Sequence, residues 1–341
     1  MFNLSLTQMP FVQNFTITAR ISNNLTEITK NLDKMEYNRH DVITPRLRRI
    51  NRLKSIHSSL TIEGNGLSMN EVASIIDGKT VVGSEKEIRE VMNADAAYKK
   101  IDSFNPFSKD DLLEAHRIMM SGLVENAGSF RTGDEAVIDN EGNIVHLAPH
   151  PEEVQGMIDD LIEWTKTSDF PMLIKSCVFH YHFEYIHPFE DGNGRIGRLW
   201  QTVLLSRTNK AFKWTPVESI IRSYQKEYYD ALEYSDSTLD CTVFLEYMTK
   251  AILEALIEIN ESSVRESVGT KSRLSSNELA LYSMIRDGYF RDIGQAADAI
   301  GVSRATLNRC LSSLKEKGLI KKEGNKKSGV WLITGKTDRT E

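Results

Sequence analysis

Hydrophobic residues recur along most of the chain at intervals of three and four positions, which is the spacing of one face of an α-helix. The stretches "NNLTEITKNLDKMEY" and "ITPRLRRINRLKSIHSSL" follow this pattern. Ser68 with Glu71, and Ser84 with Glu87, have the spacing of capping boxes, so a helix is predicted to begin after each serine. Further helices are predicted in "SKDDLLEAHRIMM", "PEEVQGMIDDLIEW" and "PMLIKSCVFHYHFEYI". We therefore expect a mainly α-helical protein.

One stretch departs from the helical pattern. "EAVIDNEGNIVHL" alternates apolar and polar residues around Asn140-Glu141-Gly142-Asn143, a sequence typical of a tight turn. Alternation with a period of two indicates strands that expose one face. We expect a small β-hairpin over residues 136–147.

The C-terminal part has a pattern of its own. Residues 261–276 are Ser-rich and lack periodicity, so they are predicted to be a linker. Helices are expected near 277–287 and 293–300, and Ser303 is placed to cap a third helix, "RATLNRCLSSLKEKG". Two short strands, "LIKKE" and "GVWLI", follow around the turn "GNKKS". This order of helices and strands indicates a winged-helix domain over residues 277–335.

The composition agrees with an ordinary globular protein. The 341 residues are enough for two domains, and the net charge of −6 argues against nucleic-acid or membrane binding by the chain as a whole. Cys177, Cys241 and Cys310 are scattered without metal-binding spacing, which favours buried thiols in a reducing compartment. No secretion signal or membrane-spanning run is apparent, so we expect a cytoplasmic protein with no membrane partner.

The stretch "HPFEDGNGRIGR" carries the candidate chemistry. Its Gly-Asn-Gly run is expected to open a helix, where free backbone N–H groups and the helix dipole favour an anion. Arg195 and Arg198 are three positions apart on that helix and are suited to phosphate contacts. Asp191 is a hard oxygen ligand of the kind that Mg²⁺ prefers beside phosphates. His187 titrates near neutrality and is a candidate general base.

Each of these features is common when it stands alone, but the combination resembles the Fic motif, HPFx(D/E)GNGRxxR. Every fixed position is present from His187 to Arg198. The flanking stretches "FHYHFEYI" and "GSFRTGDEAVI" are also similar to this family, which is also called Fido. The resemblance covers roughly residues 10–255, and it implies a helical Fic core at 106–260 preceded by an N-terminal helical region at 1–105.

The resemblance implies transfer of AMP from ATP to a hydroxyl group of a target protein. His187 would take the proton of the attacking hydroxyl, Asp191 would hold Mg²⁺ on the phosphates, and Phe189 would anchor the loop by its buried ring. The residues that would contact the phosphates are three in the loop and two on the helix: Gly192, Asn193, Gly194, Arg195 and Arg198.

Two further roles follow from the same resemblance. The hairpin at 136–147 is similar to the flap along which Fic targets bind as an added strand. The segment "YYDALE" is similar to the part that closes the adenine pocket, which makes Tyr228 and Tyr229 candidates for stacking on the base. Adjacent helical residues point in different directions, so we expect at most one of these rings to stack and the other to lie in the core.

An earlier stretch, "SLTIEGN", is similar to the inhibitory motif of Fic proteins, (S/T)xxxE(G/N). Ser59, Glu63 and Gly64 hold its fixed positions, and either Gly64 or Asn65 is expected to end a helix in the left-handed conformation. A carboxylate in the last helical turn opposes the helix dipole, so Glu63 is expected to have a partner elsewhere. The resemblance implies that Glu63 pairs with Arg198 and so inhibits the enzyme.

Several alternatives remain at this point. Related enzymes use other nucleotides or a phosphocholine donor, and the same glutamate can assist removal of AMP. Kinases of the Doc type carry Lys in place of the second loop glycine, and Gly194 favours nucleotidyl transfer over that activity. From 304 to 327 the chain carries a net charge of 8 − 2 = +6, which is compatible with a DNA-binding transcription regulator. Winged helices also serve in protein docking and in dimerisation, so a protein partner and a homodimer stay open.

Overall fold

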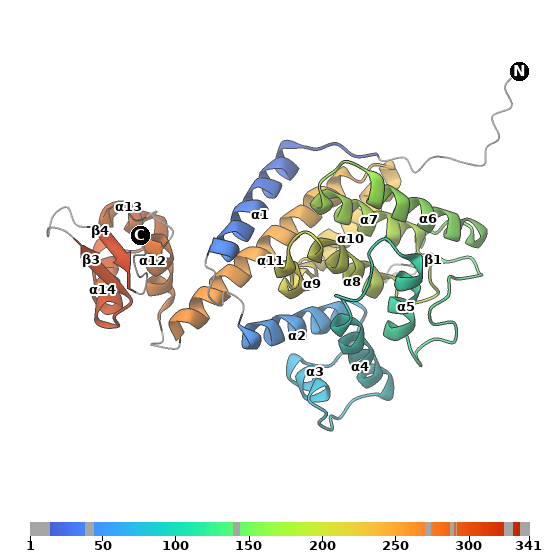
Figure 1. Ribbon diagram of the computed structural model, residues 1–341, viewed down its shortest axis with the longest axis horizontal. Helices are drawn as coiled ribbons and strands as arrows, with labels where there is room; N and C mark the ends of the chain where they lie inside the picture. The colour runs from blue at the N-terminus through green and yellow to red at the C-terminus, as the bar shows by residue number, and fades with distance from the viewer. Residues whose placement is uncertain are drawn as a thin grey trace, which may run out of the picture. The chain divides into compact units, whose positions relative to one another are not determined.

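The structure is a computed structural model that describes residues 14–37, 44–138, 144–269, 274–286, 290, 292–323 and 330–334. The chain divides into two compact units, with the boundary between Glu258 and Ile259. Figure 1 shows that both units are built mainly from helices, as the apolar spacing predicts.

The first unit contains all the helices up to α11, which continues past the boundary. In chain order they are α1 (Ala19–Tyr37), α2 (Pro45–Ile62), α3 (Met69–Ile76), α4 (Glu85–Lys99), α5 (Lys109–Met119), α6 (Pro151–Thr167), α7 (Met172–Ile186), α8 (Asn193–Ser206), the 3-10 helix η1 (Lys210–Trp214), α9 (Val217–Ser223), α10 (Gln225–Thr238) and α11 (Thr242–Gly269). The sequence suggests two regions, 1–105 and 106–260, and the described residues of both up to Glu258 lie in one compact unit.

Helices α7 and α8 form the centre of this unit. Phe179 and Phe183 of α7 and Leu199 and Trp200 of α8 are fully buried, and they pack with apolar residues of α2, α4, α5 and α6 in one core. Because α7 is apolar on nearly all sides, it has no face suited to water. The loop between α7 and α8 is consequently held against the core by its two flanking helices.

The helices begin where the sequence predicts capping boxes. The Ser68 hydroxyl accepts the Glu71 N–H, and the Glu71 carboxylate accepts the Ser68 N–H at 2.8 Å. Ser84 and Glu87 repeat this arrangement at the start of α4. The hydrogen bonds from the serine hydroxyls, followed by those from backbone N–H groups, lower the pKa of both glutamates.

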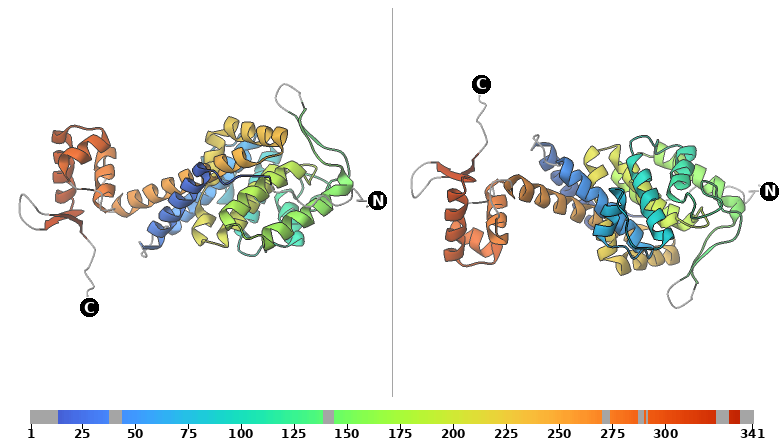
Figure 2. Two further views of the ribbon diagram at one scale, coloured as in Figure 1. Left: turned by 90° about the horizontal axis from the view of Figure 1, so that it is seen from above. Right: turned by 90° about the horizontal axis from the view of Figure 1, so that it is seen from below.

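The predicted hairpin is present. β1 (Ala136–Ile138) and β2 (Ile144–Leu147) pair antiparallel, with Ala136 opposite Leu147 and a register shift after Val137. The two strands stand out from the helices of the first unit (Figure 2). The expected turn at 140–143 lies outside the described residues.

The second unit has its own core. Its elements are α12 (Ser276–Arg286), α13 (Ile293–Ile300), α14 (Arg304–Glu316), and the antiparallel strands β3 (Ile320–Glu323) and β4 (Val330–Ile333). Ser303 caps α14 by accepting the Thr306 N–H at 3.1 Å, as predicted, and Leu307, Leu311 and Leu314 bury the inner face of α14. The order of elements agrees with the sequence prediction. The "GNKKS" turn lies outside the described residues, and the winged-helix assignment stays a prediction.

The expected linker differs from the structure in its first half. Helix α11 runs to Gly269, so residues 261–269 are helical rather than irregular. The stretch contains no proline, and its first glycine is Gly269 itself, where the helix ends. Serine, arginine, glutamate and valine cost a helix only tenths of a kcal/mol each, roughly up to 0.7, so a preceding strong helix extends through them.

Two smaller findings complete the fold. Within the part of the chain that the structure describes, no helix is both long and apolar enough to cross a membrane. Cys177, Cys241 and Cys310 are free thiols and buried, as predicted, and burial raises the pKa of Cys177 and of Cys241 to about 12.

Because each unit has its own core, we expect a cavity in the second unit to destabilise that unit alone. Leu307→Ala should lower its free energy of unfolding by about 2–5 kcal/mol, since Leu307 is fully buried. Differential scanning calorimetry of the full chain should show one transition moving to lower temperature and another unchanged. Leu332→Ala, at an exposed leucine of β4, is the control and should shift neither. Equal shifts of all transitions by Leu307→Ala would contradict independent units.

Candidate active site

The loop from His187 to Gly192 joins α7 to α8 through two left-handed residues. His187 ends α7 with φ of 48°, and Gly192 caps α8 with φ of 89°. A left-handed conformation is costly for histidine, whereas glycine adopts it freely. The Asn193 side chain closes the loop by accepting the Phe189 N–H at 2.9 Å and donating to the Phe189 carbonyl at 2.7 Å. Asn193 is thus a structural clamp of the loop as well as the first residue of α8.

Phe189 anchors the loop as the sequence suggested. Its ring is fully buried and stacks on His116, with ring centroids 3.7 Å apart. His116 in turn hydrogen-bonds the Asp191 carbonyl through Nε2 at 3.0 Å and accepts the Gly128 N–H through Nδ1 at 2.8 Å. The aromatic contact and the two hydrogen bonds tie the loop to α5 and to the segment after it.

His187 is set up to remain neutral. Its Nδ1 lies 3.3 Å from the Glu184 carbonyl, and a carbonyl can only accept, so the proton lies on Nδ1 and Nε2 is left as the acceptor. Burial lowers the pKa of His187 below its ordinary value, although the nearby Glu184 carboxylate opposes this. A neutral imidazole with an available Nε2 can take a proton from a hydroxyl group.

Arg131 holds this histidine in place, a role that the sequence analysis did not recognise. Its guanidinium donates to the carbonyl of His187 at 2.8 Å, of Gly133 at 2.8 Å and of Pro149 at 2.5 Å. The backbone N–H of Arg131 donates to the Pro188 carbonyl at 2.9 Å. Arg131 therefore joins the left-handed turn to both ends of the hairpin. A single arginine in "GSFRTGDEAVI" gives no sign in sequence of carbonyl groups that lie so far along the chain.

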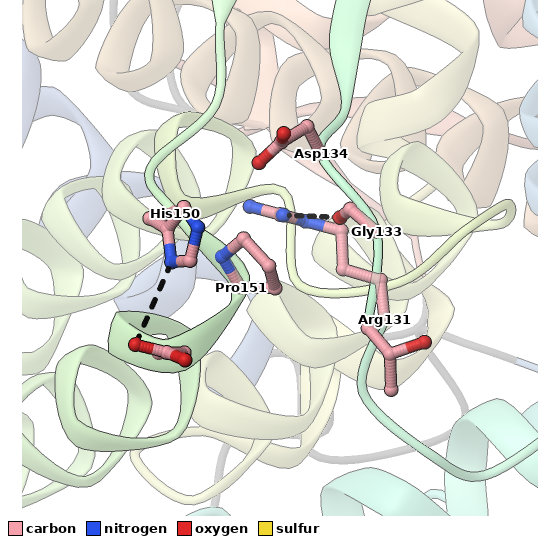
Figure 3. Close-up of a pocket in the computed structure, with 7 residues that line it drawn as sticks. Arg131, Gly133, Asp134, His150 and Pro151 are labelled. Carbon is pink, nitrogen blue, oxygen red and sulfur yellow. Dashed lines mark hydrogen bonds and ion pairs between the residues drawn. The ribbon is translucent and has the colours of Figure 1, made fainter.

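An open cavity of about 370 Å³ lies at the base of the hairpin. Arg131, Gly133 and Asp134 line it before β1, and His150 and Pro151 line it after β2 (Figure 3). The figure shows the Arg131 guanidinium between these two groups of residues, hydrogen-bonded to the Gly133 carbonyl of its own segment. Arg131 thus lines this cavity and also hydrogen-bonds the His187 carbonyl of the neighbouring loop.

The two arginines of α8 are both buried, at 3% exposure each, but they contact different acids. Arg195 Nη2 pairs with Asp191 at 2.6 Å and its Nη1 approaches Glu90 at 3.4 Å. Arg195 Nε is buried with no hydrogen-bond partner among the described residues. The two arginines are three positions apart on α8, as the sequence shows. In this structure both guanidinium groups face carboxylates: Arg195 faces Asp191 and Glu90, and Arg198 faces Glu63.

Arg198 meets the earlier motif directly. Its Nη2 pairs with Glu63 Oε1 at 2.5 Å, and its guanidinium also donates to the hydroxyl and the carbonyl of Ser59, both at 3.1 Å. Burial disfavours the charged guanidinium, but Glu63, together with the nearby Tyr228 and Glu184, raises the pKa of Arg198 above its ordinary value. The pairing of Glu63 and Arg198, predicted from the sequence, is present as an ion pair.

Gly194 makes room for this pair. A Cβ at position 194 would lie 2.5 Å from Glu63 Oε1 and 2.9 Å from Arg198 Nη1, closer than atoms can approach. The Glu63 carboxylate therefore sits directly against the backbone of the Gly-Asn-Gly run. The sequence contains two stretches of an acid followed by Gly-Asn-Gly, at 63–66 and at 191–194. They are more than a hundred residues apart in sequence but lie side by side in the fold.

The rest of the inhibitory motif ends α2. Gly64 takes the left-handed conformation, with φ of 87°, so Gly64 rather than Asn65 provides the helix cap. Asn65 is buried and donates to Glu90 at 2.8 Å, the same carboxylate that approaches Arg195. Asn65 thus links the end of α2 to Arg195 through Glu90.

The adjacent tyrosines of α10 have different environments. Tyr228 is 1% exposed, and its hydroxyl bonds His180 Nε2 at 3.0 Å, so its ring is part of the core and offers no face for stacking. Tyr229 is 45% exposed. Burial raises the pKa of the Tyr229 phenol, and the negative charge of nearby Glu63 raises it further. Tyr229 is therefore the remaining candidate to stack on a base.

A divalent cation would rely on Asp191. Among the described residues no group of three or more His, Cys, Asp or Glu side chains is arranged to hold a metal. Mg²⁺ commonly binds through one or two carboxylates and completes its shell with water and substrate phosphates. The half-exposed Asp191 carboxylate at the mouth of the loop fits that donor set.

Comparison with known proteins agrees with this geometry. A model of the Fic/DOC family matches residues 106–205, which include the whole loop. A solved structure of a Fic family protein from Desulfovibrio desulfuricans G20 is 36% identical, with a TM-score of 0.69 over 96% of this chain and 100% of that one. The chain belongs to the Fic family. The mainly helical Fic fold with a small hairpin, expected from the sequence, is thereby confirmed.

Curated relatives within the family are larger proteins. One from Caenorhabditis elegans, "Protein adenylyltransferase fic-1", is 26% identical over 260 residues, or 72% of this chain and 47% of the relative. Another from Nematostella vectensis, "Protein adenylyltransferase Fic", is 30% identical over 194 residues, or 53% of this chain and 42% of the relative. The chain thus spans less than half the length of each.

The environment of His187 predicts how it titrates. Burial disfavours the imidazolium, so we expect its pKa to lie below the ordinary value of 6.5. Nuclear magnetic resonance of the histidine ring carbons as a function of pH would measure this, with His187→Asn identifying the resonance by its loss. A His187 signal that titrates at or above pH 6.5 would contradict the burial described here.

Proposed function

We propose that the protein transfers AMP from ATP to a hydroxyl group of a target protein. The observation that carries this proposal is that one loop and the helix after it bring together His187, a helix N-terminus opened by Gly192 and the buried guanidinium of Arg198. The names of the curated Fic relatives as protein adenylyltransferases support the same reaction.

The reaction follows from what each group can do. Nε2 of His187 takes the proton of a Ser, Thr or Tyr hydroxyl, and the oxygen attacks the α-phosphorus of ATP in line. The bond from that phosphorus to the bridging oxygen breaks, and pyrophosphate leaves. Such chemistry depends mainly on positioning and on neutralising charge. Gly192, Asn193 and Gly194 cradle the phosphates with backbone N–H groups, and Mg²⁺ held by Asp191 supplies further positive charge when bound.

We further propose that Glu63 inhibits this reaction. Its carboxylate occupies Arg198 and lies against Gly194, where the terminal phosphates of ATP need to be received. A nucleotide bound beside this negative charge has its α-phosphate displaced from the line of attack, and a small misplacement of this kind can lower a rate by about a hundredfold. The same glutamate can orient a water for removal of AMP, so the reverse reaction belongs to the proposal.

Removing the carboxylate tests both halves of this proposal. Glu63→Gly should raise AMP transfer, including self-modification, by about a hundredfold, because Arg198 is then available to the phosphates. His187→Ala in the same background should abolish transfer, since no base remains. Incubation with α-labelled ATP, followed by mass spectrometry of the modified residue, measures the rate and identifies the transferred group.

Glu163→Gly, at an exposed glutamate of α6, is the matched control and should behave as the wild type. Equal labelling of the wild type and Glu63→Gly would rule out inhibition by this residue. A mixture of nucleotides in the same reaction decides whether ATP is the donor, as opposed to UTP, GTP or another donor.

The target protein is proposed to bind along the β1–β2 hairpin. His146 of β2 fastens the hairpin to the helices, with Nδ1 2.9 Å from the Asp236 carboxylate and Nε2 2.7 Å from the Tyr185 carbonyl. Leu147 at the end of β2 is 69% exposed. An anchored pair of strands with an exposed apolar residue supports addition of a target segment as a further strand, held mainly by backbone hydrogen bonds.

A second proposal concerns the C-terminal unit, which we assign to the winged-helix class. Arg304, Asn308 and Arg309 are exposed on α14, whereas Leu307, Leu311 and Leu314 of the same helix are buried. Arginine and asparagine are the residues that read base edges in a major groove, and their exposure favours duplex DNA as the partner. Docking of a protein and formation of a homodimer are the alternatives for this unit.

Binding of DNA would depend on these side chains and on salt. The full chain should retard a random DNA duplex at low ionic strength, and Arg304→Ala with Arg309→Ala should weaken binding by about tenfold or more, because two phosphate or base contacts are lost. Electrophoretic mobility shift at several salt concentrations measures this. Arg89→Ala, at an arginine on the surface of α4, serves as the control. Absence of any shift at low salt would leave a protein partner for this unit.

A further inference from the structure

One face of α2 carries a line of polar residues that is longer than the inhibitory motif. Ser55, Ser59 and Glu63 are spaced by four positions, so they lie above one another on the helix. Ser55 is 7% exposed and Ser59 is 2% exposed, so the line points into the protein interior rather than into water. Buried hydroxyl groups need hydrogen-bond partners, and the partners of these two lie on different elements.

The line ends on a buried acid of α9. The Ser55 hydroxyl donates to Glu218 Oε2 at 2.7 Å, and the Tyr98 hydroxyl donates to Glu218 Oε1 at 2.7 Å. Ser59 lies between Ser55 and Glu63 on the same face, and its hydroxyl accepts from Arg198 at 3.1 Å. The polar groups on this face of α2 thus extend from the Glu63–Arg198 pair at one end to Glu218 at the other.

Two further contacts join α2 to α9 and to the first residue of α10. Arg222 Nη1 lies 2.9 Å from His57 Nδ1, and Gln225 Nε2 donates to the Ile62 carbonyl at 3.4 Å. With Glu218, these side chains contact α2 from Ser55 to its last residue. Helix α9 and the start of α10 therefore lie along the C-terminal half of α2, next to Glu63.

Glu218 is an unusual residue for such a place. It is 1% exposed, and burial raises the pKa of its carboxyl group above the ordinary value. A buried acid costs stability unless it is fully hydrogen-bonded, and the donors from Ser55 and Tyr98 serve both of its oxygens. Its side-chain partners are on α2 and α4, not on the catalytic loop.

We propose that Glu218 is a positioning residue that fixes the orientation of α2 and thereby holds Glu63 against Arg198. Because Ser55 and Glu63 share one helical face, the bond that holds Ser55 also determines the direction in which Glu63 points. This inference rests on the proposed function, in which Glu63 is inhibitory. It adds that the inhibited state depends on a contact made eight residues before Glu63 on the same face of α2.

The test compares three variants for AMP transfer. Glu218→Ala removes the hydrogen bonds to Ser55 and Tyr98, of which only the one to Ser55 holds α2, so the rate should rise by about tenfold, the change expected when one hydrogen bond is lost from the inhibited arrangement. Glu218→Gln can still accept one hydroxyl and donate to the other, so it should stay close to the wild type. Glu63→Gly with Glu218→Ala should be no faster and no slower than Glu63→Gly alone, because both changes release the same contact.

A merely structural role gives a different pattern. If Glu218→Ala only weakened the fold, it would lower the rate in the wild type and also in the Glu63→Gly background, and either decrease would overturn the proposal. A Glu218→Ala rate equal to that of the wild type, with Glu63→Gly activated, would overturn it as well. Ser219→Ala, at the next residue of α9, loses only a bond to the Pro216 carbonyl and should leave the rate unchanged.

Hydrogen exchange separates failure of this inference from failure of the proposed function. The amides of Glu63, Gly64 and Asn65 bond to carbonyls of the last turn of α2, and their exchange should accelerate at least about threefold in Glu218→Ala but not in Glu218→Gln. This readout does not require activity. If Glu63→Gly shows no gain in AMP transfer, the inhibitory role of Glu63 fails, and unchanged exchange in Glu218→Ala would then overturn the positioning role independently.

Discussion

A buried guanidinium must have negative charge beside it, and Arg198 is the residue on which this constraint acts most strongly. It is almost fully buried near the start of α8, where the helix dipole adds further positive potential. Removing a partner from a buried charge costs about 3–5 kcal/mol, so an anion beside Arg198 is strongly favoured. In this structure the anion is Glu63, at 2.5 Å. The end of α2, the conformation of Gly64 and the absence of a side chain at Gly194 all serve that single contact.

The catalytic loop meets a second constraint, which is backbone strain. A left-handed histidine costs on the order of 1 kcal/mol and persists only where its surroundings determine it. Arg131 supplies a hydrogen bond to the His187 carbonyl, and Asn193 closes the loop around Phe189. The position of the candidate base therefore depends on residues that do no chemistry. Since Arg131 also bonds the Gly133 and Pro149 carbonyls, the histidine and the two ends of the hairpin form one connected arrangement.

Local patterns in the sequence predict the parts of this protein that local physics decides. Capping boxes at Ser68 and Ser84 give the starts of α3 and α4, and the Ser303 cap gives the start of α14. The pairing of Glu63 with Arg198 was predictable because two motifs of one family occur together. Arg131, Tyr98 and Glu218 were not, since each acts through carbonyls or hydroxyls that are distant in sequence and chemically ordinary. The helical start of the expected linker was missed because the absence of helix breakers is a weaker signal than the presence of serine.

The same constraint on Arg198 also limits how the proposed inhibition by Glu63 can end. If Glu63 moved away and nothing replaced it, the buried guanidinium would lose its partner at a cost comparable to much of the stability of a domain. Release therefore has to be an exchange of anions, in which phosphate oxygens approach as the carboxylate leaves. Such an exchange needs α2 to yield by only a small displacement, because Glu63 is the last contact of a line that begins at Ser55 and Glu218. If Glu63 inhibits and Glu218 positions α2 as proposed, the strength of the contacts on α2 sets how readily a nucleotide displaces the carboxylate, while the chemistry at His187 is left unchanged.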